Sequence, residues 1–264
     1  MYNFTYHRAG SVDAAAAKLA ESSEAKLLAG GMTLLPTMKQ RLAQPSDLID
    51  LNEIDGLKGI TVSDGTVTIG AMTRHADVAA SAEVKQAIPA LAKLAGMIGD
   101  PAVRNRGTIG GSIANNDPAA DYPAAVVGLG AAVVTNKREI AGDDFFTGLF
   151  ETALDEGEIV SAVRFPVPQK AAYFKFPNPA SRYAVVGVMV AQTAGGVRVA
   201  VTGAGPCVFR QSDMEAALSS SFSADALSGI SQDAGDLNED IHASAEYRAN
   251  LVVVGAKRAV AEIA

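Results

Sequence analysis

Strand-like and helix-like segments alternate in the first third of the chain, and this pattern limits the fold more than any other. Three short apolar segments predict strands and the two segments between them predict helices, in the order 3–6, 14–20, 26–29, 33–41 and 48–51. Ser11 suits the N-cap of the first helix, and Pro36 suits the first turn of the second. Such a β–α–β pattern places strands side by side with helices packed over them.

After residue 57 the pattern changes to hairpins and separate helices. Segments 60–62 and 66–69 flank an Asp64-Gly65 turn and predict a β-hairpin. Segment 107–121 is rich in Gly, Asn, Asp and Pro and predicts a long structured loop. The remaining predicted elements of this part are helices at 76–80, 89–98 and 124–130 and strands at 131–135 and 158–165.

A cluster of prolines at 166, 168, 177 and 179 predicts a domain boundary, because proline ends regular elements and stiffens connections. Beyond it, segments 183–193 and 197–202 predict a second hairpin, and segments 213–218 and 244–263 predict helices. The sequence therefore predicts an α+β protein that divides near residues 166–170.

Charge and cysteine content narrow the function classes. The chain of 264 residues has a net charge of −7, and its basic residues form no stripe, which argues against binding to nucleic acid or to an anionic membrane surface. The longest apolar run, 124–134, is shorter than the ~20 residues of a membrane-spanning helix. The single Cys207 closes no internal disulfide and ligates no iron–sulfur cluster alone, and the three histidines are widely spaced. We expect a cytoplasmic protein without a metal site.

Two glycine pairs are the candidate ligand-binding motifs. Gly30-Gly31 separates a predicted strand from a predicted helix, a geometry that presents backbone N–H groups to an anion such as phosphate. Gly110-Gly111 is flanked by the hydroxyl side chains of Thr108 and Ser112. Glycine allows a diphosphate to approach the main chain without meeting a Cβ atom. Either pair alone is also compatible with an ordinary tight turn.

Other signatures are incomplete. The segment Gly203-Ala204-Gly205 begins like a dinucleotide-binding fingerprint, but Val208 replaces its third glycine. No Gly-Lys pair is present, so a P-loop is excluded. Tyr183, which begins an apolar segment, suits either a half-buried anchor or an aromatic side chain over a ligand, and spacing leaves both open.

The order and spacing of the glycine motifs resemble the medium, FAD-binding subunit of the molybdenum hydroxylases, the family of xanthine dehydrogenase and aerobic carbon monoxide dehydrogenase. The resemblance spans nearly the whole chain and rests on 27–31, 104–112, 117–121, 164–166 and 175–183. It implies a PCMH-type (vanillyl-alcohol-oxidase-like) FAD-binding domain at 1–166, with subdomains at about 1–54 and 55–166. Residues 167–264 would form a C-terminal α+β domain with a small, three-stranded antiparallel sheet.

The same resemblance implies where FAD binds. The first glycine loop would wrap the diphosphate, the second would hold the opposite side and the ribityl chain, and Asp121 would contact the polar part of the cofactor. Tyr183 would be the catalytic residue, an aromatic side chain that controls access to the flavin ring. The implied cofactor-binding residues are Leu28, Ala29, Gly30, Gly31, Met32, Thr33, Leu34, Thr108, Ile109, Gly110, Gly111, Ser112, Asn115, Asp121, Ile159, Val160, Lys175 and Tyr183.

In function, the resemblance implies an oxidoreductase subunit. A small partner subunit would carry [2Fe-2S] clusters, and a large partner subunit would carry the molybdenum cofactor. The complex would be a dimer of heterotrimers. Peripheral association with a membrane through the complex is left open. Electrons would pass from the clusters through FAD to NAD⁺, a quinone or dioxygen. Two alternatives remain: a stand-alone FAD-dependent oxidoreductase of the same fold, and a non-catalytic binding module whose glycine loops are only turns.

Overall fold

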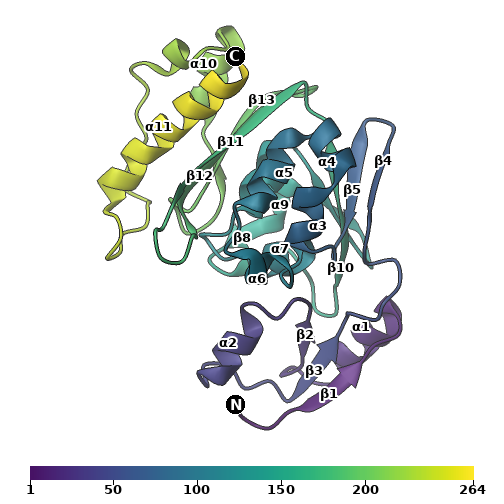
Figure 1. Cartoon of the computed structure of the whole chain (residues 1–264). Coiled ribbons are helices and arrows are strands. Elements are labelled where there is room, and N and C mark those ends of the chain that lie inside the picture. The colour runs from purple at the N-terminus through teal and green to yellow at the C-terminus, as the bar shows by residue number, and fades with distance from the viewer.

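Three main β-sheets follow one another along the chain, from the N-terminus at one end of the molecule to the C-terminus at the other (Figure 1). The computed structural model describes residues 1–264. We refer to the three parts as the N-terminal, middle and C-terminal parts.

The N-terminal part is a parallel sheet of order β1-β3-β2. Its elements are β1 (Thr5–Arg8), α1 (Val12–Ala20), β2 (Lys26–Leu28), α2 (Leu34–Lys39) and β3 (Asp47–Asp50). Ser11 caps α1 by accepting a hydrogen bond from the Ala14 N–H, as its position predicts. The buried side chains of Ala15 and Ile49 belong to a small core under this sheet. The alternation predicted for this part is confirmed.

The middle part is an antiparallel sheet of order β4-β5-β10-β6-β7. Its strands are β4 (Ile60–Ser63), β5 (Thr66–Gly70), β6 (Ala132–Thr135), β7 (Glu139–Ala141) and β10 (Val160–Pro166). Its helices are α3 (His75–Ala80), α4 (Ala82–Ala87), α5 (Pro89–Gly96), α6 (Pro101–Arg104), α7 (Ile109–Asn115), α8 (Tyr122–Gly128) and α9 (Gly142–Phe145). A two-stranded hairpin of β8 (Phe146–Gly148) and β9 (Glu151–Thr152) completes it.

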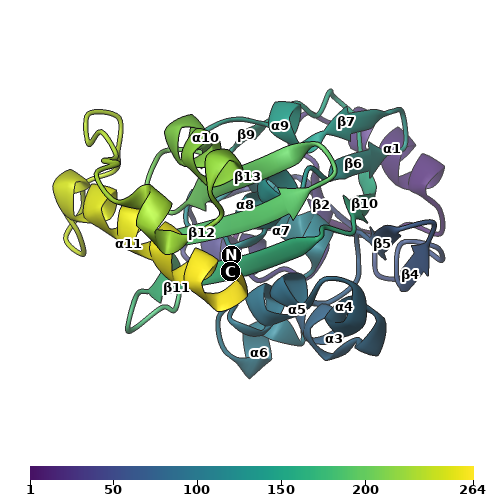
Figure 2. The same ribbon diagram turned by 90° about the horizontal axis from the view of Figure 1, so that it is seen from above.

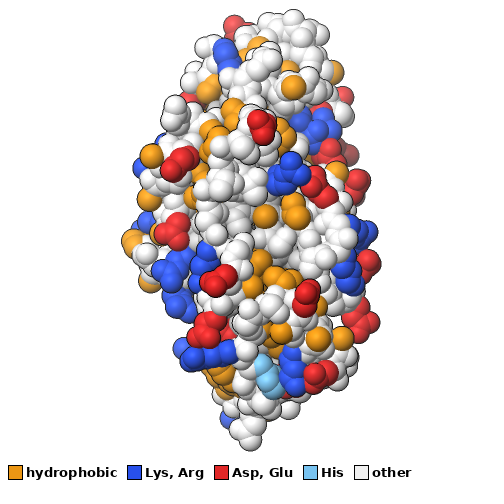
Figure 3. Space-filling model, turned by 90° about the vertical axis from the view of Figure 1, so that its right-hand side faces the viewer, with side chains coloured by type: hydrophobic (Ala, Val, Ile, Leu, Met, Phe, Trp, Pro, Cys, Tyr) orange, Lys and Arg blue, Asp and Glu red, His pale blue; other side chains and the backbone are white.

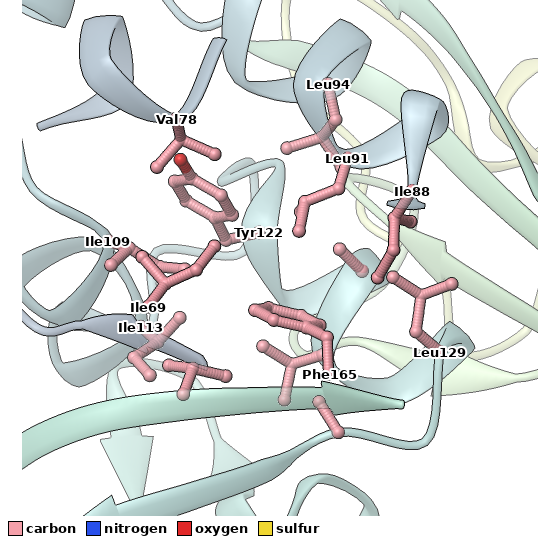
Figure 4. Close-up of a cluster of buried hydrophobic side chains, with 14 of the residues drawn as sticks. Ile69, Val78, Ile88, Leu91, Leu94, Ile109, Ile113, Tyr122, Leu129 and Phe165 are labelled. Atoms are coloured by element: carbon pink, nitrogen blue, oxygen red, sulfur yellow. The ribbon is translucent and has the colours of Figure 1, made fainter. Parts of the chain in front are cut away.

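The largest core lies between this sheet and the helices. Figure 4 shows Phe165 on the sheet facing Leu91 of α5 and Tyr122 of α8, with Ile109 and Ile113 of α7 beside them. Tyr173 and Met189 of the C-terminal part extend the same core, so the middle and C-terminal parts share buried apolar surface.

The C-terminal part is an antiparallel sheet of order β11-β12-β13-β14. Its elements are β11 (Lys170–Pro177), β12 (Ala184–Thr193), β13 (Gly196–Thr202), β14 (Phe209–Arg210), α10 (Ser212–Ser220), a 3₁₀ turn η1 (Ala224–Leu227) and α11 (Ala245–Ile263). Helices α10 and α11 cover one face and α8 and α5 the other (Figures 1 and 2). Burial on both faces explains why β12 is a continuous apolar run instead of an alternating one.

Two sequence predictions need correction. Segment 107–121 is not a loop throughout, because α7 forms at Ile109–Asn115. The glycines lower its helix propensity, but Thr108 caps it and Ile109 and Ile113 bury one face. The C-terminal sheet has four strands instead of three, because the short β14 pairs with β13. Strand β11, which the sequence analysis did not predict, occupies 170–177 in the proline-rich stretch.

No helix combines the length and the apolar character needed to cross a membrane. On the face shown in Figure 3, basic and acidic side chains are interspersed with apolar ones, without a large area of one sign.

Candidate functional site

A cleft of about 560 Å³ lies between the N-terminal and middle parts. Both glycine pairs line it, and the turn between β11 and β12 lines one side with Ser181, Arg182 and Tyr183. This volume is typical of sites for small molecules and cofactors. All three parts of the molecule therefore contribute to one concave site.

The first glycine loop presents free backbone donors to this cleft. The N–H groups of Gly30, Gly31, Met32, Thr33 and Leu34 donate to no acceptor in the chain, and all of these residues line the cleft. Gly31 has a φ of +73°, a conformation that glycine adopts without strain. Consecutive free N–H groups in such a turn form an anion-binding concavity.

The second glycine motif is different, because its amides are already used. The N–H of Ile109 donates to the Thr73 carbonyl (3.1 Å) and that of Gly110 to the Ala71 carbonyl (2.8 Å). The N–H groups of Gly111 and Ser112 both donate to Thr108, to its side-chain hydroxyl and its carbonyl respectively. This motif therefore offers a ligand its side chains instead of its main chain.

In both motifs, contacts within the protein require glycine at one position. A Cβ on Gly110 would lie 2.5 Å from the Ala71 Cβ, and a Cβ on Gly30 would lie 2.2 Å from the Arg106 carbonyl oxygen. Glycine at positions 30 and 110 therefore has a structural reason that the sequence interpretation, clearance for a phosphate, did not include. There the main chain meets a neighbouring segment of the protein.

Polar side chains of α7 and α3 line the cleft with groups that make no hydrogen bond within the protein. The Ser112 hydroxyl and the Asn115 amide project from α7 at the cleft. His75, at the start of α3, also lines it and is 4% exposed, and its Nδ1 atom has no hydrogen-bond partner. Burial, with the nearby charge of Arg104, lowers the pKa of His75 to about 4, so the imidazole is neutral at pH 7.

A buried carboxylate stands in the cleft wall. The Asp121 carboxylate accepts hydrogen bonds from the Tyr173 hydroxyl (2.7 Å) and from the Lys175 ammonium (2.8 Å). Burial raises the pKa of Asp121, and the bonds from Lys175 and Tyr173 act in the opposite direction. Burial also raises the pKa of Asp117, another residue of the wall.

The mouth of the cleft carries exposed apolar side chains from three segments. Met32 of the first loop, Phe150 of the β8–β9 turn and Tyr183 of the β11–β12 turn all line it. The Tyr183 hydroxyl faces the Thr33 side chain across the opening, and burial, followed by the charges of Asp117 and Asp121, raises the pKa of Tyr183. Tyr183 therefore stands where a side chain affects access.

Most of the residues implied by the sequence line this one cleft. Three do not line it: Leu28, Ile109, which is buried in the middle core, and Lys175, which lies behind Asp121. No sequence motif singled out His75, Ile98, Phe150 or Arg182, which also line the cleft. The left-handed φ of Phe150 (+56°) and Arg182 (+62°) depends on turns that no simple residue pattern marks.

The fold and the cleft define an α+β protein with a concave site beside a glycine loop whose backbone N–H groups have no acceptor in the chain. Residues 2–168 match a family model described as FAD binding domain in molybdopterin dehydrogenase. The carbon monoxide dehydrogenase medium chain of Hydrogenophaga pseudoflava is 37% identical, covering 97% of this chain and 96% of that one. The nicotine 6-hydroxylase medium subunit of Paenarthrobacter nicotinovorans is 35% identical, with the same coverage of both chains.

A solved structure agrees with these sequence relatives. Carbon monoxide dehydrogenase from Hydrogenophaga pseudoflava, in a form that lacks the Mo-pyranopterin moiety of its cofactor, superposes with a TM-score of 0.89 at 38% identity. The superposition covers 98% of this chain and 96% of that one. The chain belongs to the FAD-binding medium-subunit family of the molybdenum hydroxylases, which confirms the family predicted from the glycine motifs.

Proposed function

We propose that this chain binds FAD in the cleft and is the electron-transferring flavoprotein subunit of a molybdenum hydroxylase complex. The observation that carries the proposal is the row of free N–H groups from Gly30 to Leu34 at a cleft of about 560 Å³. A diphosphate is a ligand of matching charge and acceptor chemistry. The neutral His75, with an unpartnered Nδ1, supplies a further polar group for a ligand.

The assignment of residues follows from what each offers. The first glycine loop holds the diphosphate through its main chain, and Ser112 and Asn115 hydrogen-bond the ribityl hydroxyls through their side chains. Ile159 and Val160, at the start of β10, supply an apolar wall for a ring. Tyr183 limits access of solvent and acceptor at the mouth.

When bound, FAD would supply the redox chemistry, accepting and releasing electrons one or two at a time. The protein would bind and orient it and set the charge around its ring. We propose that electrons arrive from a [2Fe-2S] partner subunit, that a large subunit holds the molybdenum cofactor, and that NAD⁺, a quinone or dioxygen is the acceptor. The assembly would be a cytoplasmic dimer of heterotrimers, consistent with relatives that are named medium chains. Residues 1–166 would be the PCMH-type domain.

FAD binding to the purified chain tests this proposal. We expect one FAD per chain after reconstitution, with flavin released on heating, and reduction of the bound FAD by the reduced iron–sulfur subunit. Failure to bind FAD under any reconstitution condition would favour the non-catalytic binding module. Turnover of a soluble donor by the isolated chain would instead favour a stand-alone oxidoreductase.

A further inference from the structure

The cleft wall contains a buried ion pair that joins two parts of the molecule. Asp121 precedes α8 in the middle part, and Lys175 and Tyr173 lie on β11 of the C-terminal part. The side chains of Lys175 and Asp121 are 1% and 4% exposed, and their charged atoms are 2.8 Å apart. The Lys175 ammonium also donates to the Met97 carbonyl at 3.0 Å. The Lys175 side chain is therefore fixed and has little access to solvent.

Only one member of this cluster reaches the cleft. Asp121 lines it, whereas Lys175 and Tyr173 lie behind the wall. Lys175 donates to Asp121 Oδ2 and Tyr173 to Oδ1, so each carboxylate oxygen is held from behind. A carboxylate oxygen accepts more than one hydrogen bond, so Asp121 keeps acceptor capacity toward the cleft.

Charge balance makes Lys175 necessary for this arrangement. A carboxylate that is buried without a cation takes up a proton or destabilises the fold. A buried ammonium group without its carboxylate loses a proton or destabilises the fold in the same way. The other groups around Asp121 provide no replacement cation: Tyr173, Tyr122 and Tyr183 are neutral, and Asp117 is acidic. Lys175 is thus the cation that compensates this carboxylate.

We propose that Lys175 is a positioning residue through which the C-terminal sheet holds Asp121 charged and oriented in the wall of the FAD cleft, and that the pair together sets the reduction potential of the bound flavin. The proposal rests on FAD binding in this cleft. It changes the role of Lys175 from a cofactor contact to a residue that acts through Asp121. The C-terminal part, which carries neither cofactor-binding glycine pair, thereby influences the cofactor.

The sign of the effect follows from electrostatics. A negative charge near a flavin opposes the uptake of electrons, and a positive charge favours it. Asp121→Asn removes the negative charge from the cleft wall and is expected to raise the potential of bound FAD at pH values where Lys175 keeps its proton. Lys175→Met removes the positive charge and is expected to lower the potential at the upper end of the pH range, where Asp121 is ionised, whereas at lower pH the unpaired carboxylate takes up a proton and the shift disappears. Tyr173→Phe removes one hydrogen bond from the carboxylate and is expected to lower the potential less than Lys175→Met.

The experiment is a spectrophotometric redox titration of FAD bound to each variant, over about pH 6 to 9 so that ionisation of the buried groups is sampled. Shifts of opposite sign in the two single variants, a potential near that of the wild type in the double variant, and rescue by Lys175→Arg would support the proposal. Arg248→Met is a matched control: it removes a buried cation paired with Asp240 at 2.7 Å, and neither residue lines the cleft. It is expected to lower thermal stability without changing the potential.

Other outcomes are distinguishable. Variants that bind FAD with an unchanged potential, or that all shift it in one direction, would overturn the role of Lys175 while leaving FAD binding intact. If a Lys175→Met protein does not fold, the milder Tyr173→Phe and Lys175→Arg variants still test the sign and the rescue. Absence of FAD from the wild-type chain would instead contradict the proposed function itself.

Discussion

The two glycine motifs look alike in the sequence but have different physical tasks. At Gly30-Gly31 the backbone N–H groups have no acceptor in the chain, and both residues line the cleft. At Gly110-Gly111 the same groups are satisfied within the protein, and Gly110 is in close contact with Ala71. The first motif is thus available to bind an anion, and the second builds the wall that faces it. A glycine pair indicates that another group approaches the main chain closely. The hydrogen bonds of the folded protein show whether that group is a ligand or another segment of the protein.

The largest effect is expected from filling the second motif. Gly110→Val would place a side chain within about 2.5–2.9 Å of Ala71 atoms, where backbone must move. We expect a loss of about 3 kcal/mol in the free energy of unfolding of the FAD-free protein, measured by denaturant titration. An equally stable variant that has lost only FAD binding would return Gly110 to the ligand-contact role.

An effect of similar size is expected from the pH dependence of stability, because His75, which packs against Gly107 next to the second motif, is buried and neutral. The pKa of His75 falls from 6.5 to about 4 on folding. As the pH is lowered, His75 is therefore protonated in the unfolded chain before it is protonated in the folded protein. The His75 contribution is complete above pH 6.5 and is lost as the pH falls to about 4, a change of about 3 kcal/mol. Unfolding of the wild type and of His75→Asn across this range measures it. Parallel curves for the two proteins would show that His75 is not a buried neutral group.

A comparison of Gly31→Ala with Gly111→Ala sharpens the difference between the motifs. At Gly31, alanine must adopt a φ near +73° or change the loop, which costs about 1–2 kcal/mol. We expect the dissociation constant of FAD to rise about tenfold for Gly31→Ala. Gly111→Ala, in a helix and beside the Thr108 hydroxyl, should change it by less than about threefold. Isothermal titration calorimetry gives both values, and a larger effect at Gly111 would reverse the assignment of the two motifs.

The smallest change in affinity is expected at the mouth. Tyr183→Ala removes an exposed ring opposite Thr33 and should alter FAD affinity by less than about threefold. Reoxidation of the reduced flavin by a soluble acceptor should become faster, because the opening widens. Stopped-flow reoxidation at several acceptor concentrations tests this, and an unchanged rate would remove Tyr183 from the access route.

Much of this arrangement was predictable from local sequence. Capping at Ser11, the Asp64-Gly65 turn and the strand before Gly30 are short-range signals, and each marks an element that the structure contains. Helix α7 was not predictable, since its stability comes from burial of Ile109 and Ile113 against distant elements and its glycines argue against a helix.

In the candidate site, too, some features were predictable from local sequence and others depend on distant contacts. The glycine loop was predicted from its residues, whereas the position of Lys175 behind Asp121 depends on the packing of the C-terminal sheet against α5 and α8. The amides of Ile109 and Gly110 donate to Thr73 and Ala71, far away in sequence, so a pattern of glycines alone does not distinguish the two motifs.

Hydrogen–deuterium exchange of residues 30–34 and 109–112, with and without FAD, tests the central claim most directly. The amides of 30–34, which lack internal acceptors, should exchange rapidly in the free protein and become protected when FAD binds. The amides of 109–112, which donate within the protein, should be protected in both states and change little. Protection by FAD at 109–112 with none at 30–34 would contradict the account.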